Sequence, residues 1–209
     1  MTCRACWRII VGALLLLFPP SAEAGEITRA TIEQKIAKRQ SPLDLSNTDL
    51  SGVDLSGLDL RGADFFSSRL ADANLKGANV SSANFTRSDL QHADFSRANL
   101  SGATLYAALL EGANFSGADL TRARIIGGGK GVKFSKAKLV DADLGADPAN
   151  QGMVPVRAEL PEASFDGADL TRANLTHAVL TSANFTGAIV TGARFDYAVL
   201  DGSNLSLTR

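Results

Sequence analysis

The chain has 209 residues, of which 45% are hydrophobic, and its formal net charge is −1. This length is enough for one domain with a buried core of its own. The near-neutral charge excludes the general basic footprint of a protein that binds nucleic acid or acidic lipid, so no nucleic-acid partner is expected.

The first 24 residues have the layout of a secretory signal peptide. Two arginines supply a positive start, an apolar run follows at residues 9–18, and small residues precede position 25. The apolar run is shorter than the roughly 20 residues that span a bilayer. We therefore expect cleavage, no membrane span in the mature chain, and a periplasmic or secreted protein; a membrane anchor is the alternative. The residues of the expected cleavage site are Ala22, Ala24 and Gly25.

Both cysteines of the chain, Cys3 and Cys6, lie inside this leader. Cleavage would leave a mature chain without cysteine and with a net charge of −2, because it also removes two arginines and one glutamate. An exported protein without disulfides must be stable through packing alone.

Residues 25–42 are the one segment with helical character. Thr28 suits the N-cap, Ile32 and Ile36 fall on one face, and Pro42 ends the helix. A short helix directly before a repeat array is expected to cap the first repeat, since terminal repeats need a polar cover. A helix lying on a membrane surface is the alternative.

The remainder of the chain repeats with a period of five. Every fifth residue from Leu45 to Ile125 is apolar, a small residue often stands two places earlier, and Asp or Asn commonly stands between them. A period of five matches neither the helix nor the strand. A short period kept over so many units predicts a solenoid.

The repeats fall into three blocks, at residues 43–126, 134–144 and 158–209. The second block is one residue out of register with the first, and the third returns to the original register. Residues 127–133 carry four glycines and two lysines, and are predicted as a Gly/Lys loop at a bend that deletes one residue. They lack the spacing of a phosphate-binding loop. Residues 145–157, with two prolines, are predicted as a longer loop.

Phenylalanine positions indicate the length of one coil. Phe65 and Phe85 are twenty residues apart, and the same spacing separates two further pairs. Four pentapeptides per coil would therefore place like residues above like, with the rings stacked in columns. The two further pairs are Phe95 with Phe115 and Phe165 with Phe185.

The units at 112–116, 117–121 and 182–186 read GANFS, GADLT and SANFT. In these motifs the chain resembles the pentapeptide repeat family, over about residues 43–207. The resemblance implies an all-β solenoid, a right-handed quadrilateral β-helix with Leu, Phe and Ala inside and the variable residues outside. It implies no common activity.

The sequence contains no recognisable cluster of catalytic or metal-binding residues. The two histidines, His92 and His177, fall at outward positions and have no thiol or ligand partner at useful spacing. The aspartates at every fifth position from Asp44 to Asp64 would spiral round a four-sided coil, where bonding to nearby backbone is expected. The sequence therefore predicts no enzyme, no cofactor and no metal site.

Two groups of residues are candidates for binding a partner. Six cations lie in a stretch without any acid between Asp119 and Asp141, and could attract an anionic partner; a solvated surface is the alternative. They are Arg122, Arg124, Lys130, Lys133, Lys136 and Lys138.

The second group is apolar and lies near the C-terminus. Val179 and Val199 are twenty residues apart at the usual Asp or Asn position, and His177 and Tyr197 are twenty apart at a neighbouring position. These columns would form a small apolar patch beside an uncovered last coil. They predict a homodimer through the C-terminal coils, paired end to end or side by side.

Together these features predict a non-enzymatic exported scaffold that binds another protein. The alternative is a DNA mimic that binds type II topoisomerases, as characterised members of the resembling family do. That role needs cytoplasmic residence and a strongly acidic surface, and the sequence indicates neither.

Overall fold

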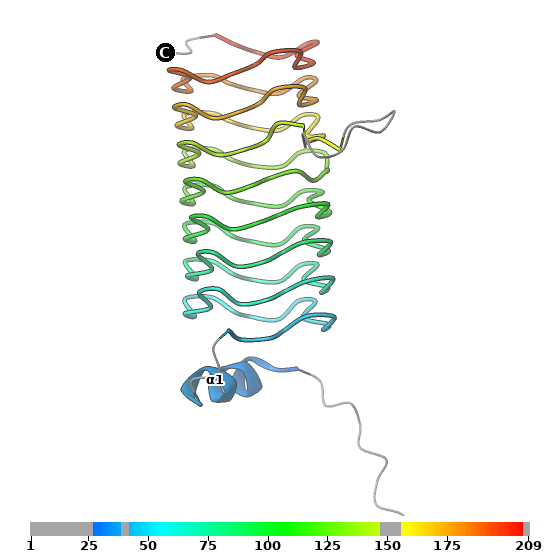
Figure 1. The fold of residues 1–209 in the computed structure, drawn as a ribbon, viewed down its shortest axis with the longest axis vertical. Helices are drawn as coiled ribbons and strands as arrows, with labels where there is room; N and C mark the ends of the chain where they lie inside the picture. Colours follow the sequence, from blue (N-terminus) through cyan, green and yellow to red (C-terminus); the bar gives the residue numbers. More distant parts are fainter. Residues whose placement is uncertain (1–26, 39–41, 147–155, 207–209) are drawn as a thin grey trace, which may run out of the picture.

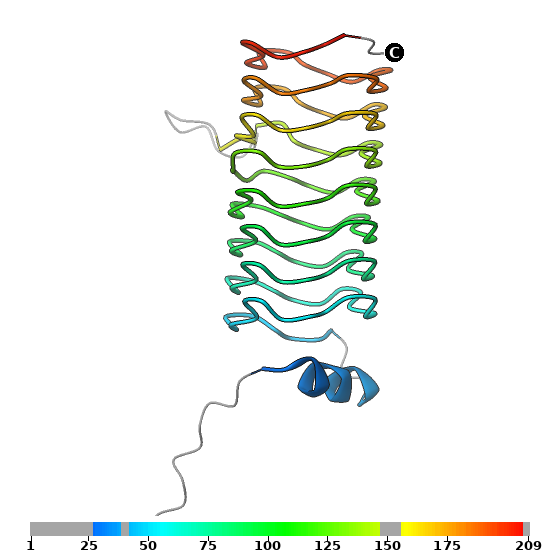
Figure 2. The same cartoon turned by 180° about the vertical axis from the view of Figure 1, so that it is seen from behind.

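The computed structural model describes residues 27–38, 42–146 and 156–206. Most of these residues form a straight rod of stacked coils, with one short helix at the end opposite the C-terminus (Figure 1). Figure 2 shows the same stack from behind. The expected cleavage site at Ala22, Ala24 and Gly25 lies outside the described residues.

The helix is α1 (Arg29–Ala37), inside the predicted segment 25–42. Thr28 is its N-cap, as predicted, and forms a capping box with Thr31. Ile32 is fully buried in the same hydrophobic cluster as the first coils, and Ile36 packs partly against that cluster. The predicted apolar face of the helix is confirmed.

Four ladders of parallel backbone bridges build the rod, and the bridged residues are normally twenty apart. We name the ladders walls 1 to 4. Wall 1 contains Asp44, Asp64, Asn84, Thr104, Arg124, Asp143, Asn174 and Arg194. Wall 2 contains Asp49, Arg69, Asp89, Leu109, Gly128, Glu159, Val179 and Val199. Wall 3 contains Asp54, Asn74, Asp94, Asn114, Lys133, Ser164, Asn184 and Asn204. Wall 4 contains Asp59, Asn79, Asn99, Asp119, Lys138, Asp169 and Ile189.

A tight turn joins each wall to the next. In the turn after Leu50, the N–H of Val53 donates to the carbonyl of Leu50 at 3.1 Å, and Gly52 has a φ of 68°. Glycine is suited to this left-handed conformation because it has no Cβ. The same turn position also holds many other residues, among them His92 and His177.

The core consists of the apolar residue that follows each bridge and the small residue that precedes it. Phe65 and Phe85 stack with ring centroids 4.7 Å apart, and the predicted pair Phe95–Phe115 stacks at 5.0 Å. The predicted pair Phe165–Phe185 stacks at 4.8 Å. Phe134 joins these last two pairs into one continuous column of five rings on wall 3. The predicted twenty-residue coil is confirmed.

The structure corrects the predicted loop at 127–133. Gly128 is bridged to Leu109 below and to Glu159 above, so this segment is wall 2 itself. The bridged position Gly128 comes four positions after Arg124, where five is the normal spacing. The shortened wall draws the backbones together: a Cβ on Gly129 would lie 2.3 Å from the Glu111 nitrogen. Gly129 permits this close approach, and Gly127 permits another, since its added Cβ would lie 2.6 Å from the Ala108 carbonyl oxygen.

The predicted loop at 145–157 departs from the coil later than its first residue. Gly145 and Ala146 still follow the wall pattern, and the Ala146 N–H donates to the Thr176 carbonyl at 3.0 Å. Bridges across this point, such as Asp143 to Asn174, join residues 31 apart. The insertion adds eleven residues to the normal twenty, and the shortened wall below it lacks one. The net addition is ten residues, a multiple of five, so the original register returns.

Candidate interaction surfaces

The ladder of aspartates serves the turns, as predicted. The carboxylate of Asp44 accepts the N–H of Ser46 at 2.9 Å, and that of Asp54 accepts the N–H of Ser56 at 3.0 Å. Asp44 and Asp49 stand on different walls, so these carboxylates do not converge. Among the described residues no group of three or more His, Cys, Asp or Glu could hold a metal ion.

The six cations of the predicted anionic-partner patch do not form one patch. Arg124 stands on wall 1, Lys133 on wall 3 and Lys138 on wall 4, because consecutive units of the chain lie on different sides of the coil. Three of the six are held by acids. The pairs are Lys130–Glu162 at 3.0 Å, Lys138–Asp119 at 3.6 Å and Arg124–Asp143 at 3.8 Å.

These cations instead belong to a basic girdle around the middle of the rod, defined here as residues 97–140. This stretch has seven basic and two acidic residues, whereas residues 43–96 have four basic and eight acidic ones. Arg97 joins the six predicted cations and shares a turn column with Lys136: a Cβ on Gly117 would lie 3.8 Å from the Arg97 side chain. Arg97 lies outside the acid-free stretch between Asp119 and Asp141, two coils earlier than Lys136, so sequence proximity did not reveal it.

The predicted apolar columns exist, the valine column on wall 2 and the ring column at the turn between walls 1 and 2. Val179 is bridged to Val199, and the rings of His177 and Tyr197 stack at 4.8 Å with their planes 10° apart. Tyr197 is 79% exposed. An exposed aromatic ring fixed by stacking gives a rigid contact surface with a polar tip.

Wall 2 is apolar over a longer distance than the sequence indicated. The bridged residues of wall 2 nearest the N-terminus, Asp49, Arg69 and Asp89, are charged. The next one, Leu109, is apolar and 53% exposed, and it lies within the basic girdle. A groove of about 300 Å³ lies beside Leu109, lined also by Ile126 and Val156. Gly128 and Glu159 also line this groove, and Val179 is bridged to Glu159 as the next residue of the wall. Wall 2 thus carries two apolar areas on one side of the rod.

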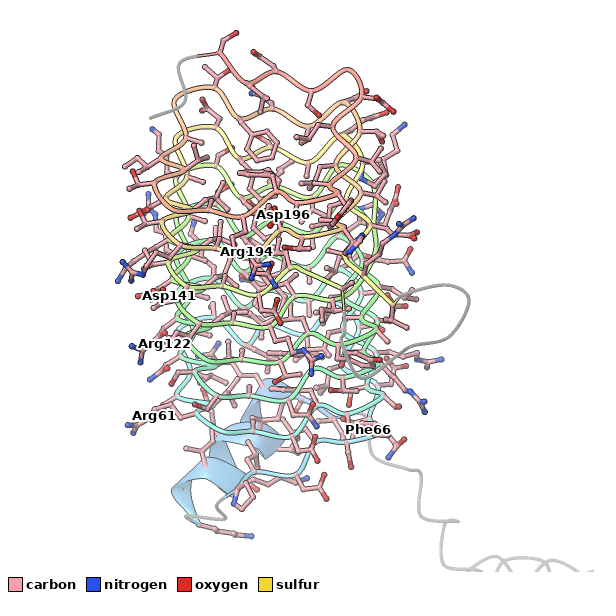
Figure 3. All side chains as sticks on the ribbon, turned by 45° about the horizontal axis from the view of Figure 1, so that its top comes forward. Arg61, Phe66, Arg122, Asp141, Arg194 and Asp196 are labelled. Carbon is pink, nitrogen blue, oxygen red and sulfur yellow. The ribbon has the colours of Figure 1, made fainter. Side chains whose placement is uncertain are left out.

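A depression of about 640 Å³ lies at wall 1 beside Ala146, with several charged and polar side chains in its lining. Within it Arg172 donates twice to Asp141, at 2.6 and 2.7 Å, and Asn174 donates to Asp143 at 2.8 Å. Arg194 pairs with Asp196 at 3.4 Å. The Arg172 guanidinium lowers the pKa of Asp141. Figure 3 shows Arg122 and Asp141 one above the other along one edge of the rod. This arrangement holds the Arg172–Asp141 ion pair with two hydrogen bonds.

This depression could not be predicted from a spacing of twenty residues. Its two halves lie on either side of the inserted segment, so neighbouring residues such as Asp143 and Asn174 are 31 apart in sequence. Thr176 Oγ1 is buried there and has no hydrogen-bond partner in the described part of the chain. The remaining lining residues are Ala142, Thr176, His177 and Arg194.

The C-terminal end of the rod is open in the described residues. Phe195 and Leu200, which correspond to fully buried positions in the coils below, are only half-buried, and Leu205 is 48% exposed. At the other end lies α1, whose Ile32 belongs to the same hydrophobic cluster as the first coils (Figure 1). The two ends of the rod are therefore different surfaces.

Comparison with known proteins identifies the repeat. The family model described as pentapeptide repeats matches residues 43–65, 68–105, 98–128, 158–196 and 173–209, which is more than half of the chain. The chain belongs to the pentapeptide repeat family. Membership implies the right-handed quadrilateral β-helix that the sequence predicted.

Several solved pentapeptide repeat proteins are similar to this chain. One is HetL, involved in heterocyst differentiation regulation in the cyanobacterium Nostoc: 24% identity, 86% of this chain and 95% of that chain covered, TM-score 0.39. A second Nostoc pentapeptide repeat protein has 30% identity over 51% of this chain and 81% of that chain, TM-score 0.42. A third is full-length QnrB1, a plasmid-mediated fluoroquinolone resistance protein: 22% identity, 77% and 90% covered, TM-score 0.46.

A search of curated proteins found no significant match. Among the described residues of this pentapeptide repeat protein, no helix is long and apolar enough to cross a membrane.

Proposed function

We propose that this pentapeptide repeat protein is an exported, non-enzymatic scaffold that binds other proteins and forms a homodimer side by side through wall 2. The observation that carries the proposal is the pair of stacked columns Val179–Val199 and His177–Tyr197. Asp or Asn occupies the equivalent position in most units, so apolar residues there serve no requirement of the coil. Burial against a partner explains them.

The rigid coil suits such a role. Side chains that are twenty residues apart in sequence stack at fixed positions, so a partner meets a surface that is ordered before binding. The groove beside Leu109 on the same wall supplies a second apolar contact for a partner protein. A stable interface buries about 800 Å² on each side, more than four side chains provide, so the contact extends along wall 2.

Oligomeric state tests the dimer. Size-exclusion chromatography with light scattering at tens of micromolar is expected to show a dimer for the wild type and a monomer for the variant Val179→Asp/Val199→Asp. Aspartate is native to this position at Asp49 and Asp89, so the variant should keep its fold. The matched control is Ile189→Asp on wall 4, 39% exposed in the wild type, which should remain dimeric. A monomeric wild type would contradict the proposal.

Export follows from the signal peptide predicted at residues 1–24. Fractionation of cells that express the full chain, followed by N-terminal sequencing, should yield a mature protein that begins at Gly25 outside the cytoplasm. An unprocessed cytoplasmic protein would contradict export while leaving the dimer intact.

We also propose that α1 caps the N-terminal end of a right-handed coil. Buried Ile32 and the bonds from Arg29 to the backbone carbonyls of Asp54 and Ser56, at 3.3 and 3.0 Å, support this role. The topoisomerase-binding DNA mimic remains the second function predicted from the resemblance. The basic girdle at residues 97–140 disfavours it, because the girdle interrupts any continuous acidic surface along the rod.

A further inference from the structure

The backbone hydrogen bonds between coils are not symmetric along the rod. Toward the next coil, the N–H of Leu50 donates to the Arg69 carbonyl at 2.7 Å and the N–H of Gly52 donates to the Ala71 carbonyl at 2.8 Å. In the opposite direction, only the N–H of Arg69 donates back, to the Thr48 carbonyl at 2.9 Å. Each full wall unit therefore presents two N–H groups and one carbonyl upward, which here means toward the C-terminal end of the rod. It presents two carbonyls and one N–H group downward, toward the N-terminal end.

The last coil leaves this excess of donors unpaired. On walls 1 and 2 the N–H groups that point upward have no acceptor in the described residues, whereas their equivalents one coil below all have one. The apolar side chains of Phe195 and Leu200 in this coil are half-buried. These unpaired donors are the N–H groups of Phe195, Tyr197, Leu200 and Gly202.

The first coil has the complementary excess of acceptors. By the same pattern, the carbonyls of each bridged residue and of the second residue after it point downward, away from the rod. On wall 3 these are the carbonyls of Asp54 and Ser56, and the Arg29 guanidinium of α1 donates to both. Ile32 of α1 is fully buried below the first coil. A cation with several donors is well suited to an end of the rod that is rich in acceptors.

We propose that the two ends of the rod bind each other between copies of this chain, and that α1 is the element that prevents it. Stacked head to tail, the N–H groups of Phe195 and Tyr197 in one copy meet the downward carbonyls of Asp44 and Ser46 in the next. Phe195 then covers Leu45, as Phe residues cover Leu within the coil. The occupant of the C-terminal end is a second copy whose α1 has swung away.

The same polarity excludes the two-fold alternative at this end. Two C-terminal ends placed face to face would oppose two N–H groups to two N–H groups on each wall, and most donors would lose their bonds to water without gaining an acceptor. Head-to-tail contact is heterologous and does not close, so it produces an open filament. This inference does not depend on the side-by-side dimer, which uses wall 2 and stops at two copies.

The test releases α1 in the full chain. Arg29→Glu/Ile32→Asp removes the donor to the first-coil carbonyls and places a charge at the buried position. We expect this variant to form filaments that grow in mass with time in light scattering and appear as rods in electron microscopy. Wild type and Gln34→Asp, a change on the exposed side of α1, should not grow.

A second change locates the growing contact. Adding Leu200→Asp to the released variant places a charge on the C-terminal end and should abolish growth. Growth that persists in this triple variant overturns the head-to-tail contact, and so does a released variant that keeps its circular dichroism spectrum yet does not grow. If the released variant unfolds, Arg29→Ala weakens the hold on α1 by removing both bonds to the first-coil carbonyls, without adding a charge. It should grow more slowly than a fully released chain, and its failure to grow would equally overturn the proposal.

Discussion

Replacing Gly129 by alanine tests whether the shortened wall requires its glycines. The added Cβ would lie 2.3 Å from the Glu111 nitrogen, 2.4 Å from the Leu110 carbonyl carbon and 2.8 Å from the Glu111 Cα, where ordinary contact begins at 3.4 Å. All three atoms are backbone, so no side chain can rotate away. The two coils must separate by about 1 Å at this point, since an overpacked core relaxes only through backbone shifts.

The expected cost follows from what this shift breaks. The bonds from Leu110 N–H to the Gly128 carbonyl, at 2.7 Å, and from Gly112 N–H to the Lys130 carbonyl, at 2.9 Å, hold the same two coils together. Two weakened bonds cost about 2 kcal/mol and the overpacking costs about 1–3 kcal/mol more, so Gly129→Ala should lower the free energy of unfolding by roughly 3–5 kcal/mol.

The neighbouring glycine is the matched control. A Cβ on Gly128 would meet only the Glu159 carbonyl oxygen at 3.5 Å and its Cβ at 3.8 Å, both ordinary contacts. Gly128→Ala should change the free energy of unfolding by less than about 1 kcal/mol, and its smaller unfolded-state entropy favours stabilisation. Urea unfolding followed by far-ultraviolet circular dichroism measures both variants. Equal stabilities for the two alanine variants would refute the close approach at Gly129.

Two further outcomes are expected. Phe115→Ala removes a fully buried ring that stacks on both neighbours in its column. It should lower the free energy of unfolding, measured with urea, by about 3–5 kcal/mol. Phe66 lies at the outer edge of the rod in Figure 3, so Phe66→Ala should lower the free energy of unfolding by less than about 1 kcal/mol. The Arg69 guanidinium and the Ser51 donors lower the pKa of Asp49 from 3.8 to about 2. Because its folded pKa lies below its unfolded value, Asp49 contributes stability above pH 3.8 that is lost as the pH falls toward 2. Between pH 5 and pH 2 the free energy of unfolding, measured with urea, should therefore fall less steeply for Arg69→Gln than for wild type. Parallel pH dependences of the two proteins would contradict the pairing.

Features that repeat every twenty residues could be predicted from the sequence. The stacked pairs Phe65–Phe85 and His177–Tyr197 needed only the coil length, which the phenylalanines themselves supplied. The N-cap at Thr28 could be predicted because capping depends on a few adjacent residues.

Features that depend on contacts between coils could not be predicted in this way. The glycines at 127–129 read as a loop because a run of glycines signals flexibility locally. Gly127 and Gly129 instead permit close approach to the backbone of the coil below, at Ala108 and at Glu111. The six cations read as a patch because they are close in sequence, but a coil of twenty residues carries neighbours such as Arg124 and Lys133 to different walls.

Disulfide cross-linking tests the proposed wall 2 dimer most directly. In the full chain with Cys3 and Cys6 replaced by serine, Val199→Cys introduces a single cysteine on wall 2, and Ile189→Cys introduces one at a similar height on wall 4. Under mild oxidation Val199→Cys should form a covalent dimer and Ile189→Cys should stay monomeric on a non-reducing gel. No dimer from Val199→Cys, or equal dimer from both, would contradict a side-by-side pair through wall 2.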